Sequence, residues 1–140
     1  MPDPHDFDSF LGLTVDHVSS DLVTAHLEIS PRHLQPYGVV HGGVYCAVVE
    51  SLASMGGASW AMEREMVGVV GVHNATDFLR SAREGVMVGR AVPVHQGRTQ
   101  QIWQVEIMLE DRLLARGQVR LQNLRDAEAI GGITPRTSVT

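Results

Sequence analysis

The feature that most constrains the fold is a nearly uncharged stretch of nineteen residues, 44–62, in which Glu50 carries the only charge. A carboxylate in the middle of a membrane span costs about 2.5–3.5 kcal/mol, and Gly56 and Gly57 would weaken such a helix further. Neither flank carries the arginine cluster or aromatic belt that anchors a span. We therefore predict no membrane partner and a long helix of a soluble protein, surrounded on most sides by the rest of the chain.

Most of the remaining sequence alternates apolar and polar residues with the two-residue period of β-strands. A short helix is expected at residues 6–11. The predicted strands cover residues 13–18, 23–29, 67–78, 86–94, 103–109 and 113–121. We expect the valine-rich run 67–78 to be a buried, bent strand. The predicted fold class is α+β, with one long central helix wrapped by a five- to six-stranded antiparallel sheet.

The length of 140 residues suits a single domain, which we place at residues 1–126, and the end of the chain at 127–140 reads as a flexible tail. The single cysteine, Cys46, excludes an internal disulfide framework. The seven histidines are scattered, so no metal site is expected. The lone cysteine and a start without a basic segment together predict a cytoplasmic protein.

The charged residues exclude several kinds of chemistry. All eleven basic residues are arginines, so a Schiff-base lysine and a phosphate-loop lysine are both ruled out. The formal net charge is −5, and the sixteen acidic residues are spread among the arginines. We therefore expect no nucleic-acid partner.

The candidate site lies at the start of the predicted helix. The pair Gly42-Gly43 leaves backbone N–H groups free there, and the helix dipole adds positive charge that can polarise a carbonyl group. Glu50 follows on the helix, where we expect Val48, Val49 and Leu52 to shield it from water. Ser54 comes one turn after Glu50 and could orient the carboxylate or a water molecule.

These residues resemble a known family. The arrangement Gln35, His41-Gly42-Gly43, Glu50 and Ser54, followed by a long helix and antiparallel strands, is similar to the hotdog-fold acyl-CoA thioesterases of the PaaI-like and hydroxybenzoyl-CoA thioesterase branch. The resemblance implies a hydrolase that cleaves acyl-CoA to a free acid and coenzyme A. It implies that Glu50 is the general base or nucleophile, that the Gly42 N–H polarises the carbonyl, and that Gln35 and Ser54 support them. No cofactor is implied, since coenzyme A is part of the substrate.

Helix geometry adds an expectation about assembly. Gly42 and Glu50 are eight positions apart, or about 12 Å along a helix, which is too far for both to touch one carbonyl group. One subunit must then supply Gln35 and Gly42 while a second supplies Glu50 and Ser54. We expect a homodimer with shared active sites, which the resemblance also implies, and which could pair further into a homotetramer.

Further residues are candidates for substrate binding. The phosphates of coenzyme A call for a local cluster of arginines, for which we consider three that flank strand ends. His41 either contacts the ligand or hydrogen-bonds to backbone. The full set of substrate-binding candidates is Tyr37, His41, Gly43, Arg80, Arg83 and Arg98. Tyr37, Trp60 and Phe78 are considered for the acyl pocket.

Two other functions remain open from the sequence. A hotdog enoyl-CoA hydratase or dehydratase would pair an acid with a catalytic histidine, for which His41 is available. A non-catalytic acyl-CoA binding protein is the other alternative, although such regulators usually carry a DNA-binding segment. Gln35 and the helix-borne Glu50 suit hydrolysis better than either.

Overall fold

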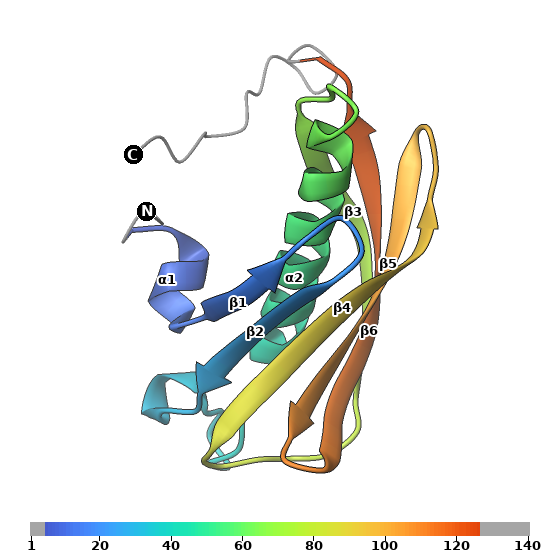
Figure 1. Ribbon diagram of the computed structural model, residues 1–140. Helices are drawn as coiled ribbons and strands as arrows, with labels where there is room; N and C mark the ends of the chain where they lie inside the picture. The colour runs from blue at the N-terminus through green and yellow to red at the C-terminus, as the bar shows by residue number, and fades with distance from the viewer. Residues whose placement is uncertain (1–4, 127–140) are drawn as a thin grey trace.

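The computed structural model describes residues 5–126, and the predicted tail at 127–140 lies outside them. Within this range the chain forms a short helix, a 3-10 turn, one long helix and six strands (Figure 1). In chain order the elements are α1 (Phe7–Leu11), β1 (Thr14–Val18), β2 (Val23–Glu28), η1 (Pro31–His33), α2 (Gly42–Met62), β3 (Gly68–Phe78), β4 (Val86–Gln96), β5 (Gln100–Leu109) and β6 (Arg112–Leu124).

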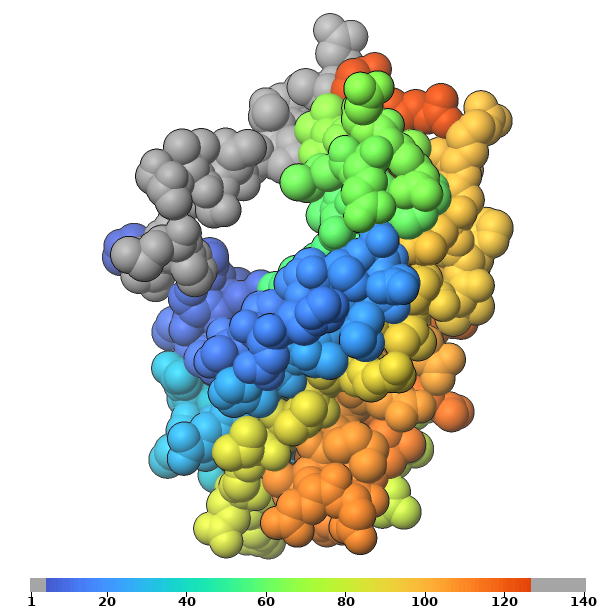
Figure 2. All heavy atoms as spheres, in the orientation of Figure 1, coloured from blue at the N-terminus to red at the C-terminus, as the bar shows by residue number. Residues whose placement is uncertain are grey.

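The six strands form one antiparallel sheet in the order β1-β2-β4-β5-β6-β3. The sheet curves around α2, which packs against all six strands (Figure 1). In the space-filling view the blue β1–β2 hairpin crosses the front of the molecule, and the yellow and orange strands form its right side (Figure 2). The predicted α+β class, the long helix and the antiparallel sheet are thus confirmed.

The expectation of a buried strand at 67–78 is wrong. β3 is the last strand of the sheet, so it pairs only with β6 and leaves its other edge unpaired. Val70 and Val72 are 36% and 52% exposed, and the register shifts between Gly71 and His73. A valine-rich run indicates a strand but not its place in the sheet, which is why the sequence misleads here.

The far half of α2 packs against the sheet through its glycine pair. Trp103 is fully buried and lies directly over Gly56, while Leu121 lies over Gly57. A buried amide network completes this layer. Trp103 Nε1 donates to Gln101 Oε1 at 2.9 Å, and Gln101 Nε2 donates to the Gly57 carbonyl at 3.1 Å. The two glycines therefore let the helix approach the sheet closely enough to satisfy these polar groups.

Replacing Gly56 with alanine should destabilise the fold. Alanine favours helix by about 1 kcal/mol over glycine, but a methyl group here would collide with the buried Trp103 ring. We expect the collision to dominate, giving a net loss of about 1–3 kcal/mol of unfolding free energy in urea denaturation. Ser59→Ala, on the same helix and half-buried, is the control and should change stability little. Equal stability of Gly56→Ala and wild type would contradict the packing argument.

The long helix is less enclosed than its sequence indicates. It begins at Gly42, two residues earlier than predicted, so both glycines lie in its first turn. One face, built by residues such as Val48, Val49 and Leu52, is buried on the sheet, but Glu50 on another face is exposed. Within residues 5–126, no helix is long and apolar enough to cross a membrane.

Candidate active site

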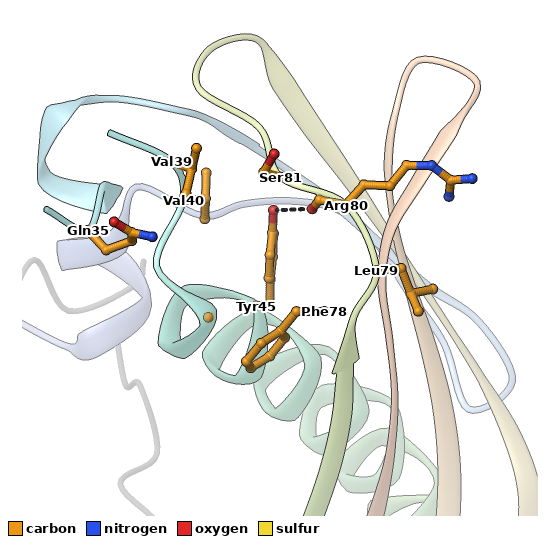
Figure 3. Close-up of a pocket in the computed structure, with 9 residues that line it drawn as sticks. Gln35, Val39, Val40, Tyr45, Phe78, Leu79, Arg80 and Ser81 are labelled. Carbon is orange, nitrogen blue, oxygen red and sulfur yellow. Dashed lines mark hydrogen bonds between the residues drawn. The ribbon is translucent and has the colours of Figure 1, made fainter. Parts of the chain in front are cut away.

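A tight loop before α2 positions Gln35. Gln35 N–H donates to the Val39 carbonyl at 2.8 Å, and Gly38 adopts a positive φ of 79° inside the turn. The Gln35 Oε1 accepts a hydrogen bond from the Tyr37 N–H. Because the carbonyl of the side chain is engaged, its NH2 group is left to donate, and Figure 3 shows that end directed toward the pocket at the start of α2.

The helix start leaves one backbone N–H available. His41 is the N-cap residue, and its Nδ1 accepts from the Gly43 N–H at 2.8 Å. An Nδ1 that accepts a hydrogen bond is unprotonated, so this histidine is neutral with its proton on Nε2. Within residues 5–126, the Gly42 N–H has no acceptor. Of the glycine pair, Gly42 therefore presents the free donor at the positive end of a 21-residue helix.

Gln35 and Gly42 line one pocket of about 280 Å³ together with Tyr45, Phe78 and Arg80 (Figure 3). The Phe78 ring lies over Gly42, so that a Cβ at position 42 would collide with it. Tyr45 closes the floor by donating its hydroxyl to the Arg80 carbonyl at 3.3 Å. Burial raises the pKa of the Tyr45 phenol, which keeps this hydroxyl protonated as a donor.

Glu50 lies in a second depression of about 440 Å³ between α1, α2 and β3, which we call the Glu50 depression. The expectation that Val48, Val49 and Leu52 shield its carboxylate is wrong, because those residues are buried in the core whereas Glu50 is exposed beside the edge strand β3. The depression is lined by Phe7, Gly43, Cys46, Ala47, Glu50, Ser51 and Asn74. Glu50 also lies against Gly71 of β3, where a side chain would contact its carboxyl group.

The apolar neighbours of Cys46 in the sequence suggest a core residue, but Cys46 is not part of the buried core. It is half-buried and lines the Glu50 depression. Its carbonyl accepts from Asn74 Nδ2 at 3.0 Å, which ties α2 to β3 beside Glu50. Ser54 is half-buried one turn beyond Glu50 and is not among the residues that line the depression.

The structure separates the candidate phosphate-binding arginines. Arg80 and Arg83 both lie in the connection from β3 to β4, near the start of α2. The Arg80 guanidinium points away from the pocket and donates to the Leu113 carbonyl at 2.9 Å (Figure 3). Arg83 Nη1 lies beside Gly38 in the loop between η1 and α2, residues 34–41, which we call the site loop. Arg98 lies in the β4–β5 turn at the opposite end of the sheet, so the three do not form one cluster within a chain.

Two of the three aromatic residues considered for the acyl pocket lie elsewhere. Tyr37 is 85% exposed in the site loop. Trp60 lies near the other end of α2, where the Arg64 guanidinium stacks on its ring at 4.0 Å. Only Phe78 lines the pocket with Gly42. In the part of the chain that the structure describes, no group of three or more His, Cys, Asp or Glu side chains could hold a metal ion.

The residues that surround Glu50 are not evident from the sequence. Phe7 and Asn74 line the same depression from α1 and β3, and Ser51 Oγ donates to Asp8 Oδ1 at 2.5 Å. Phe7, Asp8 and Asn74 are far from Glu50 in sequence, and no local motif connects them with it. The one available indication is the acidic N-cap at Asp6, which predicts where α1 begins but not what it packs against.

A long helix held in a curved antiparallel sheet defines a protein of the hotdog class. The site adds a free N–H at the start of this helix and a carboxylate two turns further along. Residues 37–116 match the family model described as the Thioesterase superfamily. The chain belongs to that superfamily.

Named relatives agree with this assignment. The Mycobacterium tuberculosis protein named "Putative esterase Rv1847" is 52% identical over 120 residues, which are 84% of this chain and 86% of that one. Its solved structure has a TM-score of 0.83 and covers 86% of this chain and 97% of its own. The 1,4-dihydroxy-2-naphthoyl-CoA hydrolase of Escherichia coli is 35% identical over 101 residues, 72% of this chain and 73% of its own. The proofreading thioesterase EntH of Klebsiella pneumoniae is 33% identical over 97 residues, 69% of each chain.

Proposed function

We propose that this protein is an acyl-CoA thioesterase that hydrolyses a thioester to a free acid and coenzyme A. The observation that carries the proposal is the free Gly42 N–H at the start of α2, beside the Gln35 amide and on the same helix as Glu50. Membership of the Thioesterase superfamily supports it. Two relatives are named for thioester chemistry, and one of them for an aromatic acyl-CoA.

The arrangement suits hydrolysis of a thioester. The Gly42 N–H donates to the carbonyl oxygen and stabilises the negative charge that develops there, with the Gln35 amide in support. Glu50 either removes a proton from a water molecule that attacks the carbonyl carbon, or attacks that carbon itself and forms a mixed anhydride that water then cleaves. In both routes the C–S bond breaks and coenzyme A leaves as a thiolate, which takes up a proton from solvent. Ser54 would orient the carboxylate or the water.

The active site would be shared between two subunits. Gln35 and Gly42 line one pocket, and Glu50 lies in a separate depression, about 12 Å from Gly42 along the axis of α2. The unpaired edge of β3, with Val70 and Val72 exposed, offers a surface on which a second copy could pair and bring its own Glu50 to the Gly42 pocket. This arrangement supports a homodimer, and a further pairing of dimers into a tetramer.

Subunit mixing tests the shared site. A Glu50→Gln subunit keeps a working Gly42, and a Gly42→Pro subunit keeps a working Glu50, so a heterodimer of the two contains one complete site. Each variant alone should be nearly inactive, and the refolded equal mixture should recover about a quarter of wild-type activity. A protein that sediments as a monomer and is fully active would contradict the shared site.

The substrate's coenzyme A phosphates would need positive charge close to the site. Arg83 is best placed, because its guanidinium lies beside the site loop. Arg80 lies near the site, but its guanidinium already donates to a backbone carbonyl. Arg98 lies in the β4–β5 turn, at the opposite end of the sheet from the Gly42 pocket.

A panel of acyl-CoA thioesters, aromatic and aliphatic, tests the proposed function by release of free thiol. We expect thiol release with at least one compact acyl group, and none above background from the Glu50→Ala variant. Enoyl hydration without thiol release would point to a hydratase, although His41 Nδ1 is occupied by the Gly43 N–H. Tight binding with no turnover would point to a non-catalytic acyl-CoA binding protein.

A further inference from the structure

The short helix α1 forms one wall of the Glu50 depression. Phe7 is the α1 residue that lines the depression, together with Ala47 and Cys46 of α2. Phe7 is 61% exposed, so its ring is open to whatever occupies the space beside Glu50. Phe10 is on the same helix and 67% exposed, but it is not among the residues that line the depression.

Hydrogen bonds at several points hold α1 in this position. A helix of five residues is not stable on its own in water. Asp6 caps it by accepting from the Ser9 N–H at 2.7 Å, which lowers the pKa of the Asp6 carboxyl. Ser51 Oγ on α2 donates to Asp8 Oδ1 at 2.5 Å. Both bonds involve residues next to Phe7 or one turn away, so they fix the position of its backbone beside the depression.

The end of α1 is tied to the site loop by a buried histidine. His33 is 1% exposed, and its Nδ1 accepts from the Ser30 N–H at 2.9 Å. The proton is therefore on Nε2, which donates to the Leu11 carbonyl at 2.7 Å. The His33 carbonyl in turn accepts from the His41 N–H at 2.8 Å, directly before Gly42. His33 thus connects the end of α1 with the start of α2.

The surface that faces the depression is largely apolar beside the carboxylate. Its other polar side chains are already engaged. Asn74 Nδ2 donates to the Cys46 carbonyl and its Oδ1 accepts from Thr76 Oγ1 at 2.7 Å, while Ser51 donates to Asp8. The Phe7 ring, Ala47 and Cys46 remain as contact surface. An apolar group attached to a carbonyl carbon next to Glu50 would therefore find packing partners here.

We propose that Phe7 is a specificity-determining residue and that α1 is the wall that limits the size of the acyl group. The inference rests on the proposed thioesterase function, because it takes the group bound beside Glu50 to be the acyl part of the substrate. The chemical class it selects is a compact apolar acyl group, a ring or short chain that packs against the Phe7 ring. Larger groups would collide with this ring, since the hydrogen bonds at Asp8 and Leu11 prevent α1 from moving away.

The test compares three variants over a series of saturated acyl-CoA thioesters of increasing length together with benzoyl-CoA. Phe7→Ala should lower kcat/KM for compact acyl groups about tenfold and raise it for long ones, which moves the preferred length upward. Phe7→Trp should move the preference in the opposite direction. Phe10→Ala, matched in residue type and helix, should leave the profile as in wild type. Ser51→Ala should produce a weaker form of the Phe7→Ala shift, because it releases α1 from α2.

The outcomes separate this inference from the proposed function. Thiol release with an unchanged length preference in Phe7→Ala and Phe7→Trp would overturn the role of Phe7. A uniform decrease for every acyl group, with a lowered melting temperature, would assign Phe7 a structural role and would also overturn it. Absence of thiol release from every thioester in wild type would instead refute the thioesterase function, and this inference with it.

Discussion

Replacement of Glu50 by glutamine is expected to lower kcat for thioester hydrolysis by about 10²–10⁴-fold while the protein stays folded and assembled. Glutamine has nearly the same shape but can neither accept a proton from water nor attack the carbonyl carbon. Because Glu50 is exposed and its side chain makes no hydrogen bond within residues 5–126, its loss should not affect stability. Thiol release under saturating substrate measures the effect, and sedimentation with thermal unfolding checks the assembly.

Ser51→Ala is not a suitable control for this prediction, since it alters the position of α1. Ser59→Ala on the same helix lies far from both site pockets and should retain full kcat. If Glu50→Gln kept activity within a few-fold of wild type, the assignment of Glu50 as base or nucleophile would be wrong.

Removal of the Gly42 N–H is expected to lower kcat by about 10²–10³-fold. Gly42→Pro deletes this donor, and the first turn of a helix tolerates proline because its N–H has no partner in the helix. The preceding residue, His41, has φ −64° and ψ 133°, which is the extended conformation that a residue before proline requires. The backbone can therefore accept the substitution without rearrangement.

Gly42→Ala is the matched control. Both substitutions add a Cβ that must displace the Phe78 ring, which is 55% exposed. Only proline removes the N–H. We therefore expect Gly42→Ala to retain much more of kcat than Gly42→Pro. Equal losses in the two variants would show that the contact with Phe78, and not the N–H donor, explains the effect.

Most of the fold could be predicted because it rests on local periodicity. The alternation through Trp103, Val105 and Ile107 places these side chains in the core, where all three are fully buried. The prediction was less accurate where the period is interrupted. Extending the alternation of Ala115, Gly117 and Val119 to the start of the strand would place Leu113 inside, but an irregularity in the β5–β6 register makes Leu114 the buried residue. A strand bulge of this kind leaves little trace in the pattern of residue types.

The candidate site could be predicted in its chemistry but not in its surroundings. The sequence shows a glycine pair at a helix start and one carboxylate on an apolar helix, and this pattern identifies Gly42 and Glu50 as candidates. The face on which Glu50 lies is not visible, because a helix that is apolar nearly all round does not indicate which side the sheet covers. The hydrogen bond between Asp8 and Ser51 joins residues 43 positions apart, and only the folded chain brings them together.

The buried amides at the far half of α2 constrain which parts of this protein can vary during evolution. Gln101, Trp103 and the Gly56-Gly57 pair form a layer well removed from the turn that carries Gly42. Substitutions around Phe7 can therefore alter which molecules are processed without disturbing this layer. The short helix α1 is thus free to diversify while the far half of α2 must be kept, so new substrate ranges can arise on an unchanged scaffold.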